Sequence, residues 1–280
     1  MVNSPKQMRI AACVTLYNSL PSCADALATY QDQVERVYLI DNSEKPDQAL
    51  ITQLIQWPTV QYLSNEGNLG VGAALNRAAR QALADGFDYL LTMDDDTALP
   101  RHALATMIRF VTDTPDAARI GIVTGVHTPP KHVVASRAVA FTMTSGNLLS
   151  LSAYKLAGPF RDDFFIDHID HEYGLRLNQA GFKVIELPGI LLQHQLGEHK
   201  ATGLGKRQFI SHAPLRGYYI ARNGWALARL YPAFRTQAAI LISKEWLKAL
   251  LFENKKGQRI SLLWRGLRDA WRGKLGKLSM

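Results

Sequence analysis

Three consecutive carboxylates follow a short apolar segment in the first half of the chain. Asp94, Asp95 and Asp96 come directly after YLLTM at 89–93. Neighbouring carboxylates repel one another, so a buried cluster of this kind requires a cation. Side chains alternate along a strand, so Asp94 and Asp96 can share a face, and open oxygen ligands suit Mg²⁺ or Mn²⁺ bound together with phosphates. A solvated acidic turn before a helix near Pro100 would fit the triplet equally well.

A second acidic group occurs in RDDFFIDHIDHEYGLRL at 161–177. Asp163, Asp167 and Asp170 recur at spacings of four and three, so we expect them to share one face of a helix. A carboxylate beside aromatic side chains can have its pKa adjusted for general-base catalysis. A capped helix with solvated acids is the alternative interpretation.

The segment NEGNLGVG at 65–72 places three glycines directly before an alanine-rich segment. Glycine lets the backbone approach a nucleotide closely, and a helix N-terminus favours anions. The segment lacks the lysine of a Walker loop and the spacing GxGxxG, so an ordinary capped loop explains it nearly as well. His194 follows the apolar residues 189–192, and no HExxH spacing accompanies it.

The elements that position these residues alternate between strand and helix patterns. The expected strands are 8–18, 34–43, 60–68 and 87–96, and the expected helices between them are Leu20–Gln33, Ala49–Trp57 and Gly70–Gly86. This order predicts an α/β fold with a mostly parallel sheet and helices on both faces. Ligands of such sheets bind at the carboxyl ends of the strands. We therefore expect one crevice lined by the polar residues that follow the strands: Asn18, Asp41, Asn65, Asn68 and Asp94 to Asp96.

The rest of the chain divides near residue 214. Before it we expect a helix at 101–112, a strand at 120–126, short strands and turns over 131–158, a helix at 170–181, and a strand pair broken at Pro188–Gly189. After it the chain becomes helical and basic. We predict a catalytic domain over 1–214 and a C-terminal helical region over 215–280.

Composition limits the class of protein. The chain has 280 residues, 47% of them hydrophobic, and a net charge of +8. No apolar segment is long enough to span a membrane, and the N-terminus lacks the pattern of a signal peptide. Cys13 and Cys23 have no metal-ligand spacing, which favours a reduced, cytosolic compartment. No feature indicates an oligomeric state.

The basic charge is concentrated at the C-terminal end, where residues 244–280 hold ten basic and three acidic side chains. Trp and Leu residues interleave with these Lys and Arg residues. The pattern fits interfacial helices on an anionic membrane, peripheral at the inner face of the cell membrane, and equally a helical pair packed on the catalytic domain. Nucleic-acid binding would use the same charge but leaves the acidic crevice unexplained, so we expect no nucleic-acid partner.

Eight segments between residues 14 and 223 occur in a characteristic order: VTLYN, IDNS, NEGNLGVGAALNRA, YLLTMDDDT, TSGNLLS, FFIDHIDHEYGLRLNQAGF, LQHQLGE and RGYYIARN. Together they resemble glycosyltransferase family 2, and within it the bacterial rhamnosyltransferase-like branch. The resemblance implies a GT-A fold. It also implies an inverting, metal-dependent glycosyltransferase that uses Mg²⁺ or Mn²⁺ and moves a sugar from a nucleotide-diphosphate donor to a glycan or lipid-linked glycan.

The resemblance also assigns residues to these roles. The donor-binding positions that it implies are Thr15, Tyr17, Asn18, Asp41, Asn68, Gly70, Asp94, Asp95 and Arg222, where Arg222 would neutralise the leaving diphosphate. Asp94 and Asp96 match the DxD pair, with Asp96 as the more direct metal ligand, and His194 matches a histidine that joins the metal or diphosphate site.

The catalytic base of the family normally lies in a Glu-Asp pair. This chain has Ile169 at the Glu position and Asp170 at the Asp position, so Asp170 is the expected base and Asp167 its rival. The branch implies dTDP-rhamnose as donor and a cell-envelope polysaccharide such as O-antigen as the destination. A nucleotidyltransferase acting on sugar phosphates would also use strand-end acids, but the loop TLYNSLPSC at 15–23 lacks the glycine-rich, basic pattern that such an enzyme needs.

Overall fold

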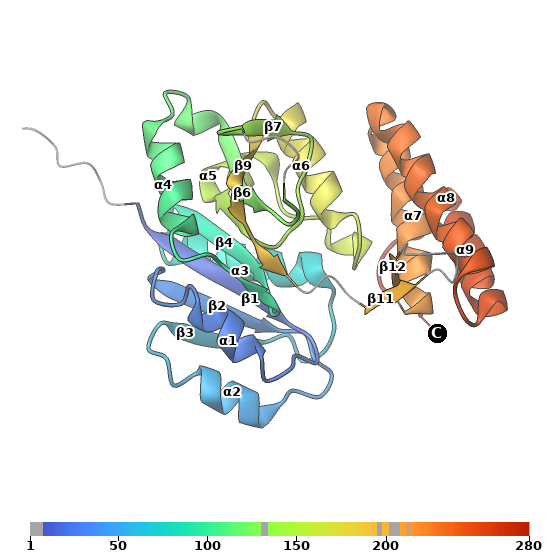
Figure 1. Cartoon of the computed structure of the whole chain (residues 1–280), viewed down its shortest axis with the longest axis horizontal. Coiled ribbons are helices and arrows are strands. Elements are labelled where there is room, and N and C mark those ends of the chain that lie inside the picture. The colour runs from blue at the N-terminus through green and yellow to red at the C-terminus, as the bar shows by residue number, and fades with distance from the viewer. Residues whose placement is uncertain (1–7, 130–133, 195–197, 202–207, 212, 280) are drawn as a thin grey trace, which may run out of the picture.

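Eight strands form one mixed sheet with the spatial order β3-β2-β1-β4-β8-β6-β9-β7 (Figure 1). The structure, a computed structural model, describes residues 8–129, 134–194, 198–201, 208–211 and 213–279; for 194, 198–201 and 208–211 it describes the backbone. The strands of this sheet are β1 (Ile10–Leu16), β2 (Arg36–Asp41), β3 (Val60–Ser64), β4 (Tyr89–Asp94), β6 (Ile120–Val126), β7 (Arg137–Val139), β8 (Asn147–Ser150) and β9 (Lys183–Leu191). Two short pairs accompany it, β5 (Thr97–Ala98) with β10 (Gln193–His194), and β11 (Glu198–Ala201) with β12 (Gln208–Ser211).

The helices connect the strands or follow the sheet. They are α1 (Cys23–Ala28), α2 (Gln48–Leu54), α3 (Val71–Ala84), α4 (Ala103–Asp113), α5 (Leu151–Ala157), α6 (Ile169–Gln179), α7 (Pro214–Leu230), α8 (Arg235–Leu251) and α9 (Lys256–Trp271), with short 3₁₀ turns η1 (Ala117–Arg119), η2 (Asp162–Phe164) and η3 (Pro232–Phe234).

The sheet is parallel where the sequence alternates strand and helix, and antiparallel beyond that part. β3, β2, β1 and β4 pair in parallel, and so do β6 and β9. β8 runs antiparallel to both β4 and β6, and β7 runs antiparallel to β9. The predicted mostly parallel sheet with helices on both faces is confirmed, and the four parallel strands bring their carboxyl ends to one edge.

Alternation along β1 shows how the two faces are covered. Ile10, Ala12 and Val14 join a core that includes buried residues of α1, α2 and α4. Ala11 and Cys13 point to the other face, where α3, α5 and α6 pack. A period of two in an entirely apolar strand gives two buried faces, as expected for a strand in the middle of an α/β sheet. Burial raises the pKa of the Cys13 thiol to about 12, consistent with a core residue.

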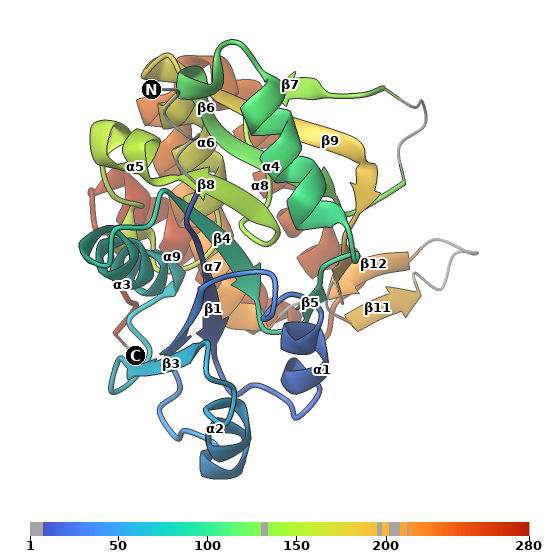
Figure 2. The ribbon, with the colours of Figure 1, turned by 90° about the vertical axis from the view of Figure 1, so that its left-hand side faces the viewer.

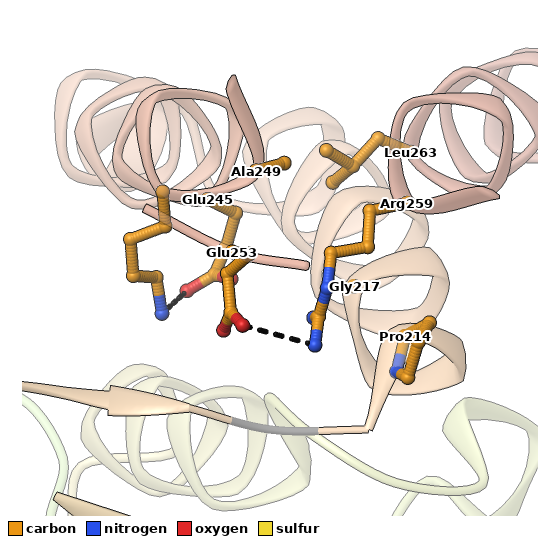
Figure 3. Close-up of a pocket in the computed structure, with 8 residues that line it drawn as sticks. Pro214, Gly217, Glu245, Ala249, Glu253, Arg259 and Leu263 are labelled. Atoms are coloured by element: carbon orange, nitrogen blue, oxygen red, sulfur yellow. Dashed lines mark ion pairs between the residues drawn. The ribbon is translucent and has the colours of Figure 1, made fainter. Parts of the chain in front are cut away.

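The three C-terminal helices pack against one another at one side of the sheet (Figure 1). Where α7, α8 and α9 meet, Arg259 pairs with the buried Glu253 at 3.1 Å and Lys248 pairs with Glu245 (Figure 3). α7 begins at Pro214, close to the predicted domain boundary. Within the described part of the chain, no helix has the length and apolarity needed to cross a bilayer.

Three expectations about local structure were wrong. Residues 151–157 form the helix α5, where turns and short strands were expected. The strand β9 continues through Pro188 and Gly189, and its irregularity is a shift in register against β6. Asp163, Asp167 and Asp170 do not share a helix face, because α6 begins only at Ile169 and left-handed residues precede it.

Candidate active site

The parallel register places three of the predicted site residues at one edge of the sheet. Thr15 of β1 lies beside Asp94 of β4, and Leu16, the next residue of β1, lies beside Asp41 of β2. Strand pairing alone therefore brings these three positions together, as expected for residues of one crevice. No side-chain contact is needed to bring these positions together, since each follows from where its strand ends.

The acidic triplet is held by backbone and hydroxyl contacts. The backbone N–H of Asp94 donates to Ser145 Oγ at 2.8 Å, and Ser19 Oγ donates to the carboxylate of Asp95. Thr92 Oγ1 donates to the carbonyl of Thr144 at 2.6 Å. The segment TSGN at 144–147 thus supports the end of β4, and all three carboxylates remain partly exposed at the start of a turn.

Asp41 is buried, and other groups of the protein occupy both of its oxygens. Its Oδ1 accepts from the backbone N–H of Ser43 at 2.8 Å, and its Oδ2 accepts from Tyr62 OH at 2.9 Å. Ser43 in turn accepts at Oγ from the N–H of Asn18, which adopts a left-handed φ of 50°. Tyr17 is 48% exposed beside it. These contacts fix the loop after β1 against the loop after β2.

The glycine-containing loop closes tightly onto a later segment. Asn68 Oδ1 accepts from the N–H of Gly70 at 2.9 Å, and Asn42 Nδ2 donates to the carbonyl of Gly70 at 3.0 Å. Gly70 has a φ of 91°, and a Cβ atom there would lie 2.5 Å from the carbonyl oxygen of Phe165. Glycine is required here both by its backbone angle and by this close approach. Asn65 extends the network, because its Nδ2 donates to Asn42 Oδ1 at 2.7 Å.

The acidic segment before α6 has an unusual backbone. Phe165, Asp167 and His168 adopt left-handed φ values of 66°, 62° and 63°. Each such residue other than glycine costs of order 1–3 kcal/mol when it lacks compensation, so surrounding contacts must hold the loop in place. We call residues 163–170 the acidic loop.

Two neighbouring residues of α7 supply that compensation. Asn223 Nδ2 lies 2.8–2.9 Å from the carbonyl oxygens of Phe164, Ile166 and Asp167. The guanidinium of Arg222, which is 1% exposed, donates to the carbonyl of Phe164 at 2.8 Å. The buried N–H groups of Arg222 and Asn223 therefore hydrogen-bond to the backbone carbonyls of the acidic loop.

The two acids that compete for the role of base differ in their surroundings. Asp167 accepts from Arg216 Nε at 2.9 and 3.1 Å through its two oxygens. Burial raises the pKa of Asp167, and the pairing with Arg216 opposes this increase only in part. For Asp170, burial also acts to raise the pKa, but the neighbouring His171 outweighs it and lowers the pKa below its ordinary value. Asp170 is thus ionised at neutral pH.

His171 contacts Asp170 through one oxygen. Its backbone N–H donates to Asp170 Oδ1 at 2.8 Å, and its Nδ1 lies 2.7 Å from the same atom. The imidazole packs against Phe141, with 4.1 Å between ring centroids. This ring contact fixes the orientation of His171, and through it that of the Asp170 carboxylate.

Arg216 connects the two acidic groups. Burial lowers the pKa of its guanidinium, but the carboxylates of Asp167, Asp170 and Asp94 raise it, and the net shift is upward. The end of β4 and the acidic loop therefore lie within electrostatic reach of one cation. Within RGYYIARN the resemblance indicates the second arginine, Arg222, as the functional one; in the structure the first, Arg216, is the one that lies among the acids.

Comparison with known proteins shows the family of the chain. The sequence profile of glycosyl transferase family 2 matches residues 11–158, more than half of the chain. The chain belongs to this family. It is 24% identical over 242 residues to the dTDP-rhamnosyl transferase RfbF of Shigella flexneri, covering 79% of this chain and 80% of that protein. The predicted likeness to the rhamnosyltransferase-like branch is confirmed.

Solved structures show the same fold. GalNAc-T7 with UDP, GalNAc and Mn²⁺ superposes with a TM-score of 0.60 at 12% identity, over 94% of this chain and 55% of that chain. S. aureus TarS 1–349 with UDP-GlcNAc gives a TM-score of 0.58 at 14% identity, over 94% of this chain and 81% of that chain. The GT-A fold expected for this glycosyltransferase is confirmed. Family membership favours a glycosyltransferase over the nucleotidyltransferase and nucleic-acid-binding alternatives.

The carboxylates at the end of β4 are suitable ligands for a divalent ion that is shared with the substrate. Asp94 and Asp96 offer carboxylate oxygens, and no three acidic, His or Cys side chains gather into a metal cluster among the residues described. Mg²⁺ is usually held by one or two carboxylates together with substrate phosphates, so a two-carboxylate set suits it. The backbone of His194 pairs with Thr97, directly after the triplet, while its side chain lies outside the described part of the structure. Its predicted role at the metal stays a prediction.

The contacts of Arg222 differ from those expected of a diphosphate ligand. Its Nε donates to Asn223 Oδ1 at 2.9 Å, its other donors contact the carbonyls of Asp163, Phe164 and Gly276, and its guanidinium lies over Tyr219. A role at the leaving diphosphate would require these buried bonds to break, so the geometry favours a role in holding the acidic loop.

Proposed function

We propose that this glycosyltransferase transfers a sugar from a nucleotide-diphosphate donor to a hydroxyl group of a glycan or lipid-linked glycan acceptor, with inversion of the anomeric configuration. The observation that carries the proposal is the contact of Arg216 Nε with both oxygens of Asp167, at 2.9 and 3.1 Å, in a chain of glycosyl transferase family 2 whose acidic triplet begins at the end of β4. The electrostatic influence of Asp94 on the same guanidinium supports one reaction centre that uses both acidic groups.

Asp170 is the proposed base. It is ionised at neutral pH and held by His171, whereas both oxygens of its rival Asp167 accept from Arg216. A base that removes the acceptor proton as the hydroxyl attacks the anomeric carbon supports a single displacement, which inverts the configuration. The pairing with Arg216 gives Asp167 a different task, namely to position that arginine.

Asp94 and Asp96 would hold Mg²⁺ or Mn²⁺, with His194 as the further proposed ligand. When bound, the ion would neutralise charge that develops on the leaving diphosphate. Arg216 would supply a further positive charge to the reaction centre, and preorganised charge of this kind stabilises a leaving group without reorganisation. Thr15, Tyr17, Asn18, Asp41, Asn68 and Gly70 are the proposed donor contacts.

For the donor we propose dTDP-rhamnose, on the likeness to RfbF. The purified chain is incubated with a panel of nucleotide sugars and an acceptor glycan, and the products are examined by NMR for anomeric configuration. Transfer from dTDP-rhamnose with inversion supports the proposal. Transfer restricted to a UDP-hexose would refute the donor, and retention would refute the single displacement.

The metal role is tested by calorimetric titration of nucleotide diphosphates with and without Mn²⁺. Asp94→Ala with Asp96→Ala should abolish the part of the affinity that depends on Mn²⁺. Asp113→Ala with Asp116→Ala, two exposed acids at the end of α4 and just beyond it, removes the same charge elsewhere and should leave that affinity unchanged. If the first variant keeps the full Mn²⁺ effect, the triplet does not bind the ion.

A further inference from the structure

An open hollow of about 420 Å³ lies between α7 and the end of α9, where the chain continues toward its C-terminus. Tyr218 of α7 forms part of its wall, and half of the ten residues that line it are basic. We call this hollow the basic pocket. Its basic residues are Arg265, Arg268, Arg272, Lys274 and Lys277.

A single carboxylate lies among the lining residues of the basic pocket. Asp269 is buried, accepts from Tyr218 OH at 3.1 Å, and lies 3.8 Å from Nε of Arg265 and of Arg268. Lys277 also lies 3.8 Å from Glu44, but both side chains are more than half exposed, and such pairs contribute little. Even when Asp269 and Glu44 are both counted against the five cations, three positive charges remain in excess.

A second hollow in the same helices provides a contrast (Figure 3). Glu245, Lys248, Glu253 and Arg259 line it, the two acids pair with the two bases, and its volume is about 10 Å³. Its charges cancel and it has little room, as expected of a packing junction. The basic pocket differs in both respects, because the described acids compensate only part of its charge and its volume is large. Clustered like charges attract anions and favour their binding.

The residue types indicate which anion fits. Guanidinium groups bind phosphate oxygens through paired N–H donors, and three arginines line the pocket. On α9, Trp264 and Trp271 are 62% and 73% exposed, and their spacing of seven residues places them on one face of the helix. Exposed indoles beside cationic side chains are typical of protein segments at the interface between a membrane and water.

We propose that the basic pocket binds the phosphate group of an anionic phospholipid, with Trp264 and Trp271 at the surface of the bilayer. Lys277 on the pocket wall donates to the carbonyl of Asn68 at 3.0 Å, in the loop that connects β3 to α3; both elements are labelled in Figure 2. A bound headgroup therefore lies next to the loop that we assign to the donor, which brings the reaction centre close to a membrane-borne acceptor. The binding itself does not depend on the proposed reaction.

The test uses the full chain and vesicles of phosphatidylglycerol with phosphatidylcholine, and pure phosphatidylcholine as the reference. One variant removes three charges of the pocket, and a matched control removes three exposed charges elsewhere in residues 235–271. The substitutions are R268Q, R272Q and K274Q in the pocket, and K244Q, K255Q and K256Q in the control; all six side chains are exposed. Each basic residue near an anionic surface contributes to attraction, so both variants should bind the phosphatidylglycerol vesicles more weakly than the wild type. We expect the loss of vesicle affinity, measured by co-sedimentation, to be at least ~10-fold greater for the pocket variant than for the control.

Equal losses in the two variants would overturn the proposal, because diffuse attraction depends on total charge alone. A second measurement is calorimetric titration with glycerol 1-phosphate and with inorganic phosphate. Saturable binding by the wild type and the control, but not by the pocket variant, supports the site. Binding of soluble phosphate without partition onto phosphatidylglycerol vesicles would overturn the assignment to lipid. Circular dichroism of each variant verifies that it is folded.

Discussion

His168 offers a quantitative test of the acidic loop. It lies between the two acids that compete as base, is 5% exposed, and has a left-handed φ of 63°. Burial, followed by the nearby His171, lowers the pKa of His168 from the ordinary 6.5 to about 4, although Asp170 and a backbone contact with Ile220 oppose the shift. At neutral pH the folded protein therefore holds an uncharged imidazole in its core.

The sign and size of the resulting pH effect follow from linkage. Between pH 6.5 and 4 the unfolded chain binds a proton at His168 and the folded chain does not, so the free energy of unfolding falls as the pH falls. The full stability is present above pH 6.5. A difference of roughly 2.5 units at about 1.36 kcal/mol each gives a loss of about 3 kcal/mol by pH 4.

The assay is urea unfolding at several pH values for the wild type and His168→Asn. Asparagine tolerates the left-handed backbone, so the loop can keep its conformation. We expect the variant to be less stable at pH 7 because its side chain is smaller. From pH 7 to 4, however, it should lose about 3 kcal/mol less than the wild type. Groups that do not interact with residue 168 titrate alike in both proteins, so their contributions cancel. Parallel pH profiles would refute an uncharged, buried His168.

Three other substitutions test neighbouring contacts. Asp170→Asn should lower kcat by about 10²–10⁴ and leave donor affinity in calorimetry unchanged; an active variant would disqualify Asp170 as the base. Gly70→Ala should lower the unfolding free energy by about 1–3 kcal/mol, measured in urea, because its Cβ would meet the carbonyl of Phe165; an unchanged midpoint would contradict that close approach. Asn76→Ala removes the two buried hydrogen bonds between the Asn76 side chain and the backbone of Phe160. It should lower the free energy of unfolding in urea by about 2–4 kcal/mol. A decrease below about 0.5 kcal/mol would show that water replaces these bonds.

The sheet and its edge could be predicted because local patterns determine them. Apolar runs separated by helix patterns predict parallel strands, and parallel strands end on one side. Asp41 and Asp94 therefore follow from strand order alone. At position 70 the sequence suggested only that glycine could let the backbone approach a nucleotide; the close approach in the structure is to the carbonyl of Phe165, which lies far along the chain.

The acidic loop could not be predicted in this way. Spacings of four and three among Asp163, Asp167 and Asp170 are a helical signal, and no local pattern indicates the left-handed residues that interrupt it. The loop keeps its shape because Arg222 and Asn223, more than fifty residues later, bind its carbonyls. These contacts, which offset the cost of the left-handed residues, can be seen only in the tertiary structure. The register of β9 across Pro188 depends likewise on its pairing with β6.

The helices α7 and α9 support the proposed reaction centre, although the sequence suggests a boundary near residue 214. α7 supplies Arg216 to the acids, and its Arg222 and Asn223 hold the loop that presents Asp170. α9 packs on α7 so closely that a Cβ at Gly266 would lie 2.4 Å from the carbonyl of Tyr218. A contact made on α9 therefore acts on the helix that holds the acidic loop, because closely packed interiors transmit strain.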